Sequence, residues 1–146
     1  THSTRVRVAE ICRDLDYITT DTCNTHNTIN QKSYDCYLKD ILDHEMVVCP
    51  RGNGIDCHRT WEAIYLGVIP IVKRTVLSEY FYDLGLPILL ISNWNEVDDF
   101  DAEYLSRFYA EHSDKFRSMY IWADAWLECF SSGVDPLSKI ELERES

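Results

Sequence analysis

Glycines, an aspartate, an arginine and a glutamate follow one another closely near the middle of the chain. The stretch reads Pro-Arg-Gly-Asn-Gly-Ile-Asp-Cys-His-Arg-Thr-Trp-Glu from residue 50 to residue 62. Arg59 and Glu62 are three positions apart, so they would share one face of a helix. A guanidinium can bind a diphosphate bidentately, and a carboxylate can accept hydrogen bonds from ribose hydroxyls. The spacing therefore predicts a nucleotide-binding site, with an ion pair within one helix as the structural alternative.

The loop before Arg59 favours a negatively charged ligand. An apolar strand is predicted at Met46 to Cys49 and a helix at Cys57 to Leu66. Asp56 is expected to cap the start of that helix, and Gly67 is expected to end it. The N-terminus of a helix leaves backbone N–H groups unpaired and carries the positive end of the helix dipole, so it attracts phosphate. Gly52 and Gly54 allow positive φ and let a ligand approach the backbone closely.

Motifs and charge exclude several other classes of protein. The chain has neither the Gly-Lys-Ser/Thr of a P-loop nor a Gly-x-Gly-x-x-Gly fingerprint. A formal net charge of -11 argues against nucleic-acid binding. No apolar run reaches the ~18 residues of a membrane span, and residues 1–10 show no signal-peptide pattern. A diphosphate would have to bind against this negative field. The local positive groups therefore become more important: Arg51, Arg59, Lys73 and Arg74.

Helical and apolar extended segments alternate along the chain. Helices are predicted at Thr4 to Leu15, Ser33 to Asp43, Cys57 to Leu66, Val76 to Leu84, Asp99 to His112 and Asp114 to Phe130. Ser33 is expected to cap the second of them, and Thr75 or Ser78 the fourth. Strands are predicted at Tyr17 to Thr20, Met46 to Cys49, Val68 to Lys73 and Pro87 to Ser92. This alternation predicts an α/β fold, a Rossmann-like, doubly wound parallel sheet of about four strands flanked by helices. Ligands of such sheets bind at the carboxyl ends of the strands.

One domain is expected over residues 1–136, followed by a charged tail at 137–146 that is expected to fray. A loop is predicted at Asp21 to Lys32. Tyr34 and Tyr37 are expected in the core, and Trp94 either packs there or stacks on a base or sugar. The helical spacing of five apolar residues near the end of the chain also predicts core positions: Met119, Trp122, Trp126, Leu127 and Phe130.

The six cysteines form neither a Cys-x-x-Cys pair nor a zinc-type pattern with histidines. Cys12, Cys36, Cys49 and Cys129 lie among apolar residues and are expected to be buried free thiols. A disulfide through Cys23 stays open as an alternative for a secreted parent protein. The compartment, secretory pathway or cytoplasm, is therefore not determined by these patterns.

Residues Val47 to Lys73 resemble the C-terminal signature of exostosin-like (GT47-type) glycosyltransferases. That signature runs from a Pro-Arg-Gly loop through Arg-x-x-Glu-Ala to a Gly-x-x-Pro turn, all present here. The resemblance implies one half of a GT-B fold that binds a nucleoside diphosphate sugar. Glu62 would hold the ribose, Arg59 and the loop amides would face the diphosphate, and Arg51 and His58 would make secondary contacts. The implied binding residues are Arg51, Gly52, Asn53, Gly54, Asp56, His58, Arg59 and Glu62.

The same resemblance implies the partners of the domain. The acceptor would be a glycan or glycoprotein that receives a hexosyl or pentosyl group, and an N-terminal GT-B domain or partner chain would supply the catalytic base. GT-B enzymes do not usually need a metal ion, so no metal or other cofactor is expected. The alternative is a truncated, non-catalytic module that binds a nucleotide or another protein.

Overall fold

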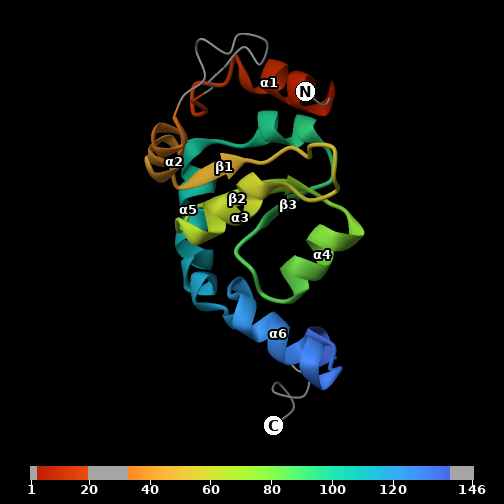
Figure 1. Cartoon of the computed structure of the whole chain (residues 1–146). Helices are drawn as coiled ribbons and strands as arrows, with labels where there is room; N and C mark the ends of the chain where they lie inside the picture. The colour runs from red at the N-terminus through yellow and green to blue at the C-terminus, as the bar shows by residue number, and fades with distance from the viewer. Residues whose placement is uncertain (1–2, 20–32, 139–146) are drawn as a thin grey trace.

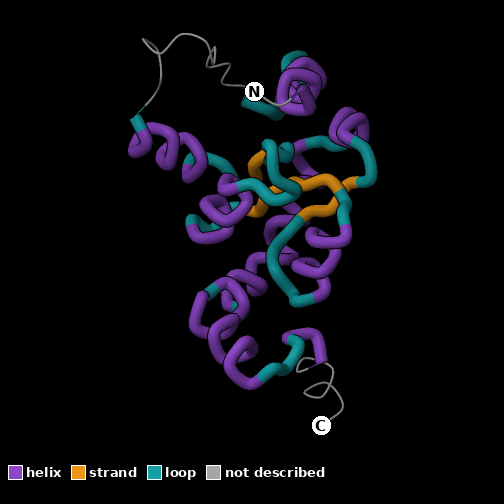
Figure 2. Tube along the Cα trace, turned by 45° about the vertical axis from the view of Figure 1, so that its right-hand side comes forward, coloured by secondary structure: helices purple, strands orange, loops and turns teal. Residues whose placement is uncertain are grey.

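A computed structural model describes residues 3–19 and 33–138 of the chain. Within them, three parallel strands form one sheet in the order β1-β2-β3 (Figure 2). The strands are β1 (Met46–Val48), β2 (Ile69–Lys73) and β3 (Leu89–Ile91). The predicted α/β fold, compatible with a Rossmann-like architecture, is confirmed with a smaller sheet than expected. Residues 17–19 form no strand, so that part of the predicted Tyr17 to Thr20 strand is wrong.

Helices surround the sheet, and α1 and α6 lie at opposite ends of the molecule (Figure 1). The α-helices are α1 (Ser3–Cys12), α2 (Tyr34–Leu42), α3 (His58–Tyr65), α4 (Val76–Asp83), α5 (Ala102–His112) and α6 (Ala123–Ser132). The described residues also form three 3-10 helices: η2 (Trp94–Asp99), η3 (Ser113–Arg117) and η4 (Met119–Ile121). The predicted loop at Asp21 to Lys32 and most of the predicted charged tail lie outside the described residues.

The core has a layer on each face of the sheet. Ile71 packs with residues of α1 and η2, whereas Val72 packs with residues of η4 and α6. Successive side chains of a strand point to opposite faces, so these two neighbours of β2 belong to different layers. Because a core layer covers each face of the sheet, β2 and β3 are almost continuously apolar. None of the helices in the described part has the length and apolar composition of a membrane span.

Helix ends follow local rules in most places. The Ser33 side chain accepts from the Cys36 N–H and begins α2 as predicted, and Thr75 forms a capping box with Ser78 at α4. Gly67, at φ +77°, follows the end of α3 as predicted. Asp56, however, does not cap α3. Cys57 occupies the N-cap position and makes no side-chain bond there.

The two loop glycines do not use the positive φ that the lack of a side chain allows them. Gly52 and Gly54 both lack positive φ, which is confined to Gly67, Gly85 and Gly133 among the glycines. Gly52 instead allows a close approach, because a Cβ there would lie 3.2 Å from Arg5 Nη2 of α1. The loop therefore turns without left-handed residues, and α1 packs closely against it.

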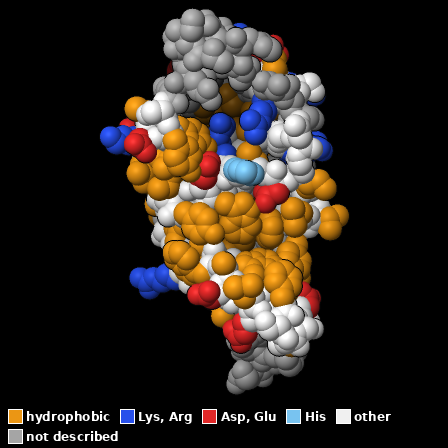
Figure 3. All heavy atoms as spheres, in the orientation of Figure 1, with side chains coloured by type: hydrophobic (Ala, Val, Ile, Leu, Met, Phe, Trp, Pro, Cys, Tyr) orange, Lys and Arg blue, Asp and Glu red, His pale blue; other side chains and the backbone are white. Residues whose placement is uncertain are grey.

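The predicted long helix at Asp114 to Phe130 is also wrong. The chain has extended backbone at Ser118 and Trp122, which separates η3, η4 and α6. These breaks change the direction of the side chains, so only Trp126 of the predicted core residues packs against the core. The others are exposed, with Phe130 at 77%; these are Met119, Trp122, Leu127 and Phe130. Figure 3 shows that hydrophobic side chains also gather on one face of the molecule.

Four cysteines of the described residues are buried free thiols: Cys12, Cys49, Cys57 and Cys129. Cys36 is a free thiol too, but it is exposed, so its predicted burial is wrong. It lies in the first turn of α2, a helix whose buried contact is made by Ile41 at the opposite end. Burial raises the pKa of the Cys49 thiol well above its ordinary value. Cys23 lies outside the described residues.

Candidate functional site

A pocket of about 450 Å³ is bounded by the loop after β1 and by the first turns of α3. Residues of α1 and α2 complete its lining. We call it the loop pocket. It is lined by Arg5, Tyr37, Gly52, Asn53, Gly54, Asp56, Cys57, His58, Arg59 and Glu62. Seven of the eight residues predicted from the sequence therefore line one pocket. The eighth, Arg51, lines the adjoining cavity.

Glu62 is held by two tyrosines of α2. The Tyr37 hydroxyl lies 2.8 Å from Oε2 and the Tyr34 hydroxyl 3.1 Å from Oε1, and both donate to the carboxylate. A carboxylate has about four acceptor positions, so two remain for other donors such as ribose hydroxyls. The sequence placed both tyrosines in the core, yet Tyr34 is 59% exposed.

Arg59 is joined to Glu62 through Tyr37. The Arg59 Nε donates to the Tyr37 hydroxyl at 3.2 Å, and the guanidinium carbon lies 5.6 Å from the centre of the Tyr37 ring. Within the described residues, no direct ion pair joins Arg59 to Glu62, so the predicted alternative is replaced by a bridge through a hydroxyl. That bridge orients the guanidinium and leaves its terminal nitrogens for a ligand.

The environment of Tyr37 keeps its hydroxyl protonated. Burial and the hydrogen bond to Glu62 raise the pKa of Tyr37 to about 12, against the opposing effect of Arg59. The hydroxyl can then donate to Glu62 while it accepts from Arg59. The hydrogen bond to Glu62 also raises the pKa of Tyr34. At neutral pH, the Glu62 carboxylate therefore keeps two hydroxyl donors.

Replacing Tyr37 with phenylalanine is expected to make the free energy of unfolding fall less steeply as the pH rises above 10. The pKa of Tyr37 rises from 10 to about 12 on folding. Its stabilising contribution is thus complete below pH 10 and is lost as the pH rises towards 12. Urea unfolding at steps between pH 8.5 and 12 measures this slope. Tyr65→Phe is the matched control, because Tyr65 is exposed and its ring lies tilted against that of Trp122. Equal slopes for both variants would contradict the assignment.

The three other charged or titratable residues predicted for the site differ in their contacts. Asp56 accepts from the Cys57 N–H and from the Trp61 indole N–H, each at 2.7 Å, so its carboxylate holds the loop against α3. Arg51 donates weakly to the carbonyl oxygens of Gly52 and Asn53, at 3.4 Å each. His58 is exposed on the first turn of α3.

Arg5 is a pocket residue that the sequence reasoning missed. Its Nη2 lies 3.5 Å from the Cys57 sulfur, and its Nε is buried without a hydrogen-bond partner. It belongs to α1, more than 40 positions before the loop, and nothing in the sequence around it marks a site. Only the packing of α1 against the loop brings this cation to the pocket.

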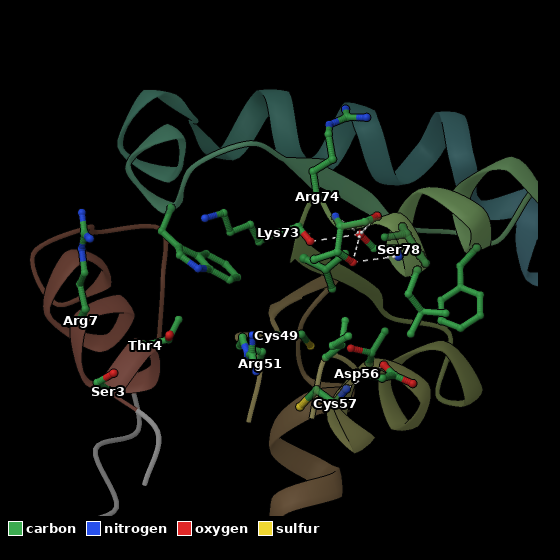
Figure 4. A pocket seen from close by; sticks show the side chains of 18 residues that line it. Ser3, Thr4, Arg7, Cys49, Arg51, Asp56, Cys57, Lys73, Arg74 and Ser78 are labelled. Carbon is green, nitrogen blue, oxygen red and sulfur yellow. Dashed lines mark hydrogen bonds between the residues drawn. The ribbon is translucent and has the colours of Figure 1, made fainter. Parts of the chain in front are cut away.

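A second cavity, of about 630 Å³, opens at the carboxyl ends of β1 and β2. We call it the strand-end cavity. It shares Asp56 and Cys57 with the loop pocket, and its cationic lining residues are Arg7, Arg51, Lys73 and Arg74 (Figure 4). Trp94 also lines it, but this side chain is 6% exposed and belongs to the core layer around α1, which favours the packing role.

Among residues 3–19 and 33–138, no group of three or more His, Cys, Asp and Glu side chains is arranged to hold a metal ion. The loop pocket is lined by the guanidinium groups of Arg5 and Arg59 and by the carboxylates of Asp56 and Glu62. The arrangement can therefore neutralise an anionic ligand with side chains and backbone N–H groups of the chain itself.

Comparison with known proteins identifies a family of sugar-transferring enzymes. The model of the RXYLT1 C-terminal domain matches residues 3–132. Ribitol-5-phosphate xylosyltransferase 1 from Homo sapiens and from Mus musculus is 25% identical over 42% of this chain. The matched part is 17% of the length of each relative. These matches confirm the coarse resemblance to the C-terminal domain of a glycosyltransferase.

Proposed function

Because this chain belongs to the RXYLT1 C-terminal domain family, we propose that it is the donor-binding domain of an exostosin-like glycosyltransferase. In this proposal it is one half of a GT-B enzyme and binds a nucleoside diphosphate sugar for transfer to a glycan or glycoprotein acceptor. The observation that carries the proposal is the single loop pocket that gathers Arg59, Glu62 and the residue 52–56 loop. The name of the relatives makes a xylosyl donor the first sugar to test.

In this proposal, Arg59 and Glu62 of the loop pocket bind different parts of the donor. Arg59 binds the diphosphate with the guanidinium nitrogens that Tyr37 leaves unoccupied, helped by loop N–H groups of Asn53 and Gly54. Glu62 accepts hydrogen bonds from the ribose hydroxyls at positions that the tyrosines do not fill. A volume of about 450 Å³ lies within the usual range for small-molecule sites, about 300–1,000 Å³.

During transfer, an acceptor hydroxyl oxygen forms a bond to the anomeric carbon of the donor sugar. The bond from that carbon to the diphosphate oxygen breaks, and the nucleoside diphosphate leaves with the electron pair. Arg59 stabilises the negative charge that develops on the leaving diphosphate. The hydroxyl proton goes to a general base, which we assign to the partner N-terminal domain or chain. Guanidinium groups provide the positive charge, so we propose that donor binding needs no divalent cation and is unchanged by EDTA.

The experiment is a thermal-shift titration of the full chain against UDP, GDP, ADP and CDP. A ligand at 100 times its dissociation constant stabilises the folded state by ~2.7 kcal/mol, a shift of several degrees for a domain of this size. We expect one of the four to raise the melting temperature, and UDP-xylose to do so when UDP does. No shift with any of them would contradict donor binding. A shift without sugar transfer, even with the complementary domain added, would favour the non-catalytic nucleotide-binding module.

A further inference from the structure

An exposed aromatic ring lies at the edge of the loop pocket. Tyr34 is the first residue of α2 and is 59% exposed. Its hydroxyl donates at 3.1 Å to Oε1 of Glu62, a residue that lines the pocket. Its ring centre lies 6.0 Å from that of Tyr37, with an angle of 32° between the ring planes. A ring held beside a pocket and open to solvent offers a surface on which a flat ligand group can stack.

Contacts at both ends of the Tyr34 side chain hold this ring in place. The Ser33 side chain accepts from the Cys36 N–H and caps the helix that begins at Tyr34. The hydroxyl bond to Glu62 joins the other end of the side chain to α3, 28 positions further along the sequence. A side chain that is already ordered loses less conformational entropy when a ligand stacks on it.

The docking of α2 against α3 does not explain why an aromatic ring occupies position 34. Ile41 packs with Ala63 and Val68 in a buried cluster, and Tyr37 packs against the same cluster. Tyr37 also bonds to Glu62, at 2.8 Å. These contacts already join the two helices, and the exposed ring of Tyr34 adds little buried area to them. A ligand outside the core is the better explanation for the ring.

The groups around Glu62 follow one another in a row. Arg59 donates to the Tyr37 hydroxyl at 3.2 Å, and that hydroxyl donates to Oε2 of Glu62. Tyr34 donates to the other carboxylate oxygen, Oε1. The row therefore consists of a guanidinium, a carboxylate and an exposed ring. A nucleoside diphosphate has its parts in the matching order, which is the diphosphate on the 5′ carbon, the ribose hydroxyls, and the planar base on the 1′ carbon.

We propose that the base of the donor nucleotide stacks on the ring of Tyr34. This inference rests on the proposed function, which assigns the diphosphate to Arg59 and the ribose to Glu62. With these two parts bound, the 1′ carbon of the ribose directs the base away from Arg59 and towards Tyr34. Every base has a π face that can stack on a tyrosine ring. An uncharged base is also not repelled by the negative charge of the chain.

The test is isothermal titration of the full chain, as wild type and as Tyr34→Ala. The ligands are UDP, GDP, ADP, CDP and ribose 5-diphosphate, which has no base. We expect Tyr34→Ala to lower the affinity for the nucleotide that wild type binds by about fivefold to a hundredfold, the effect of losing one base stack. The affinity for ribose 5-diphosphate should change by no more than about twofold, because Arg59 and Glu62 are still present.

Two control variants accompany this test. Tyr34→Phe keeps the ring and removes only the hydroxyl, so it should recover most of the nucleotide affinity that Tyr34→Ala loses. Tyr65→Ala removes another exposed tyrosine, one that lines neither cavity, and should leave all these affinities unchanged. Binding of ribose 5-diphosphate by Tyr34→Ala also shows that this variant folds and keeps its pocket.

The outcomes separate this inference from the proposed function. Equal nucleotide affinity of wild type and Tyr34→Ala would overturn the inference and leave the donor site supported. An equal loss for the nucleotide and for ribose 5-diphosphate would overturn it as well, because Tyr34 would then act only by holding Glu62. If wild type bound none of the four nucleotides, the proposed function itself would be contradicted, and the base contact with it.

Discussion

Glu62→Ala is expected to lower the affinity for a ribonucleoside diphosphate by at least about tenfold and to abolish its preference over the 2′-deoxy form. The proposed role of Glu62 is to accept hydrogen bonds from the ribose hydroxyls. A ligand without one hydroxyl should therefore lose little further affinity in the variant. Titration of wild type and variant with both forms of the nucleotide measures this coupling directly.

The same variant also removes the acceptor of two tyrosine hydroxyls. We therefore expect a loss of about 1 kcal/mol of folding stability, because the Tyr37 hydroxyl keeps its bond from Arg59 and the exposed Tyr34 hydroxyl can bind water. Tyr34→Phe removes one of these bonds and keeps the carboxylate, so it is the matched control for the stability loss. If the Glu62→Ala variant still preferred the ribonucleotide, the proposed ribose contact would be contradicted. Glu62 would then only hold α2 against α3 through its bonds to Tyr34 and Tyr37.

Arg59→Ala is expected to lower the affinity for a nucleoside diphosphate by about tenfold to a hundredfold, because it removes the charged donor assigned to the diphosphate. Arg59→Lys should recover only part of the loss. An ammonium keeps the charge, but it cannot form two parallel hydrogen bonds or the same contact with the Tyr37 hydroxyl. Titration calorimetry with the three proteins gives the order wild type, lysine variant, alanine variant.

The nucleoside without phosphates is the control ligand for Arg59. Its affinity should be the same for wild type and for Arg59→Ala, since it lacks the group that the guanidinium binds. Arg117→Ala controls for the loss of one positive charge from an acidic chain. An equal loss for nucleoside and nucleoside diphosphate would mean that Arg59 only supports the fold, through its bridge to Tyr37.

The contacts within one turn or one helix were predictable because they depend on neighbours in the sequence. Ser33 and Thr75 begin their helices as expected, since a hydroxyl at an N-cap needs only the backbone two or three residues on. Gly67 ends α3 for a comparable local reason. The i, i+3 spacing likewise brought Arg59 and Glu62 to the same pocket.

Predictions failed where the same local sequence pattern is compatible with two different structures. Asp56 has the chemistry of an N-cap, but the Trp61 indole and the adjacent N–H of Cys57 take its oxygens, and the cap position moves on by one. Residues 114–130 have helical spacing, yet the extended backbone at Ser118 and Trp122 divides them. Periodicity describes which residues could share a face, and it does not exclude a break.

The sequence by itself determined the order of the β-loop-α-β unit, the caps of two helices and the residues of the loop pocket that lie in its own loop and helix. Only the tertiary structure decided what surrounds them. Tyr37 lies 25 positions before Glu62, and Arg5 comes from α1, and both reach the pocket because α1 and α2 pack against the loop and α3. The core contacts that dock these helices join residues distant in the chain, and a pattern of neighbours carries no information about them.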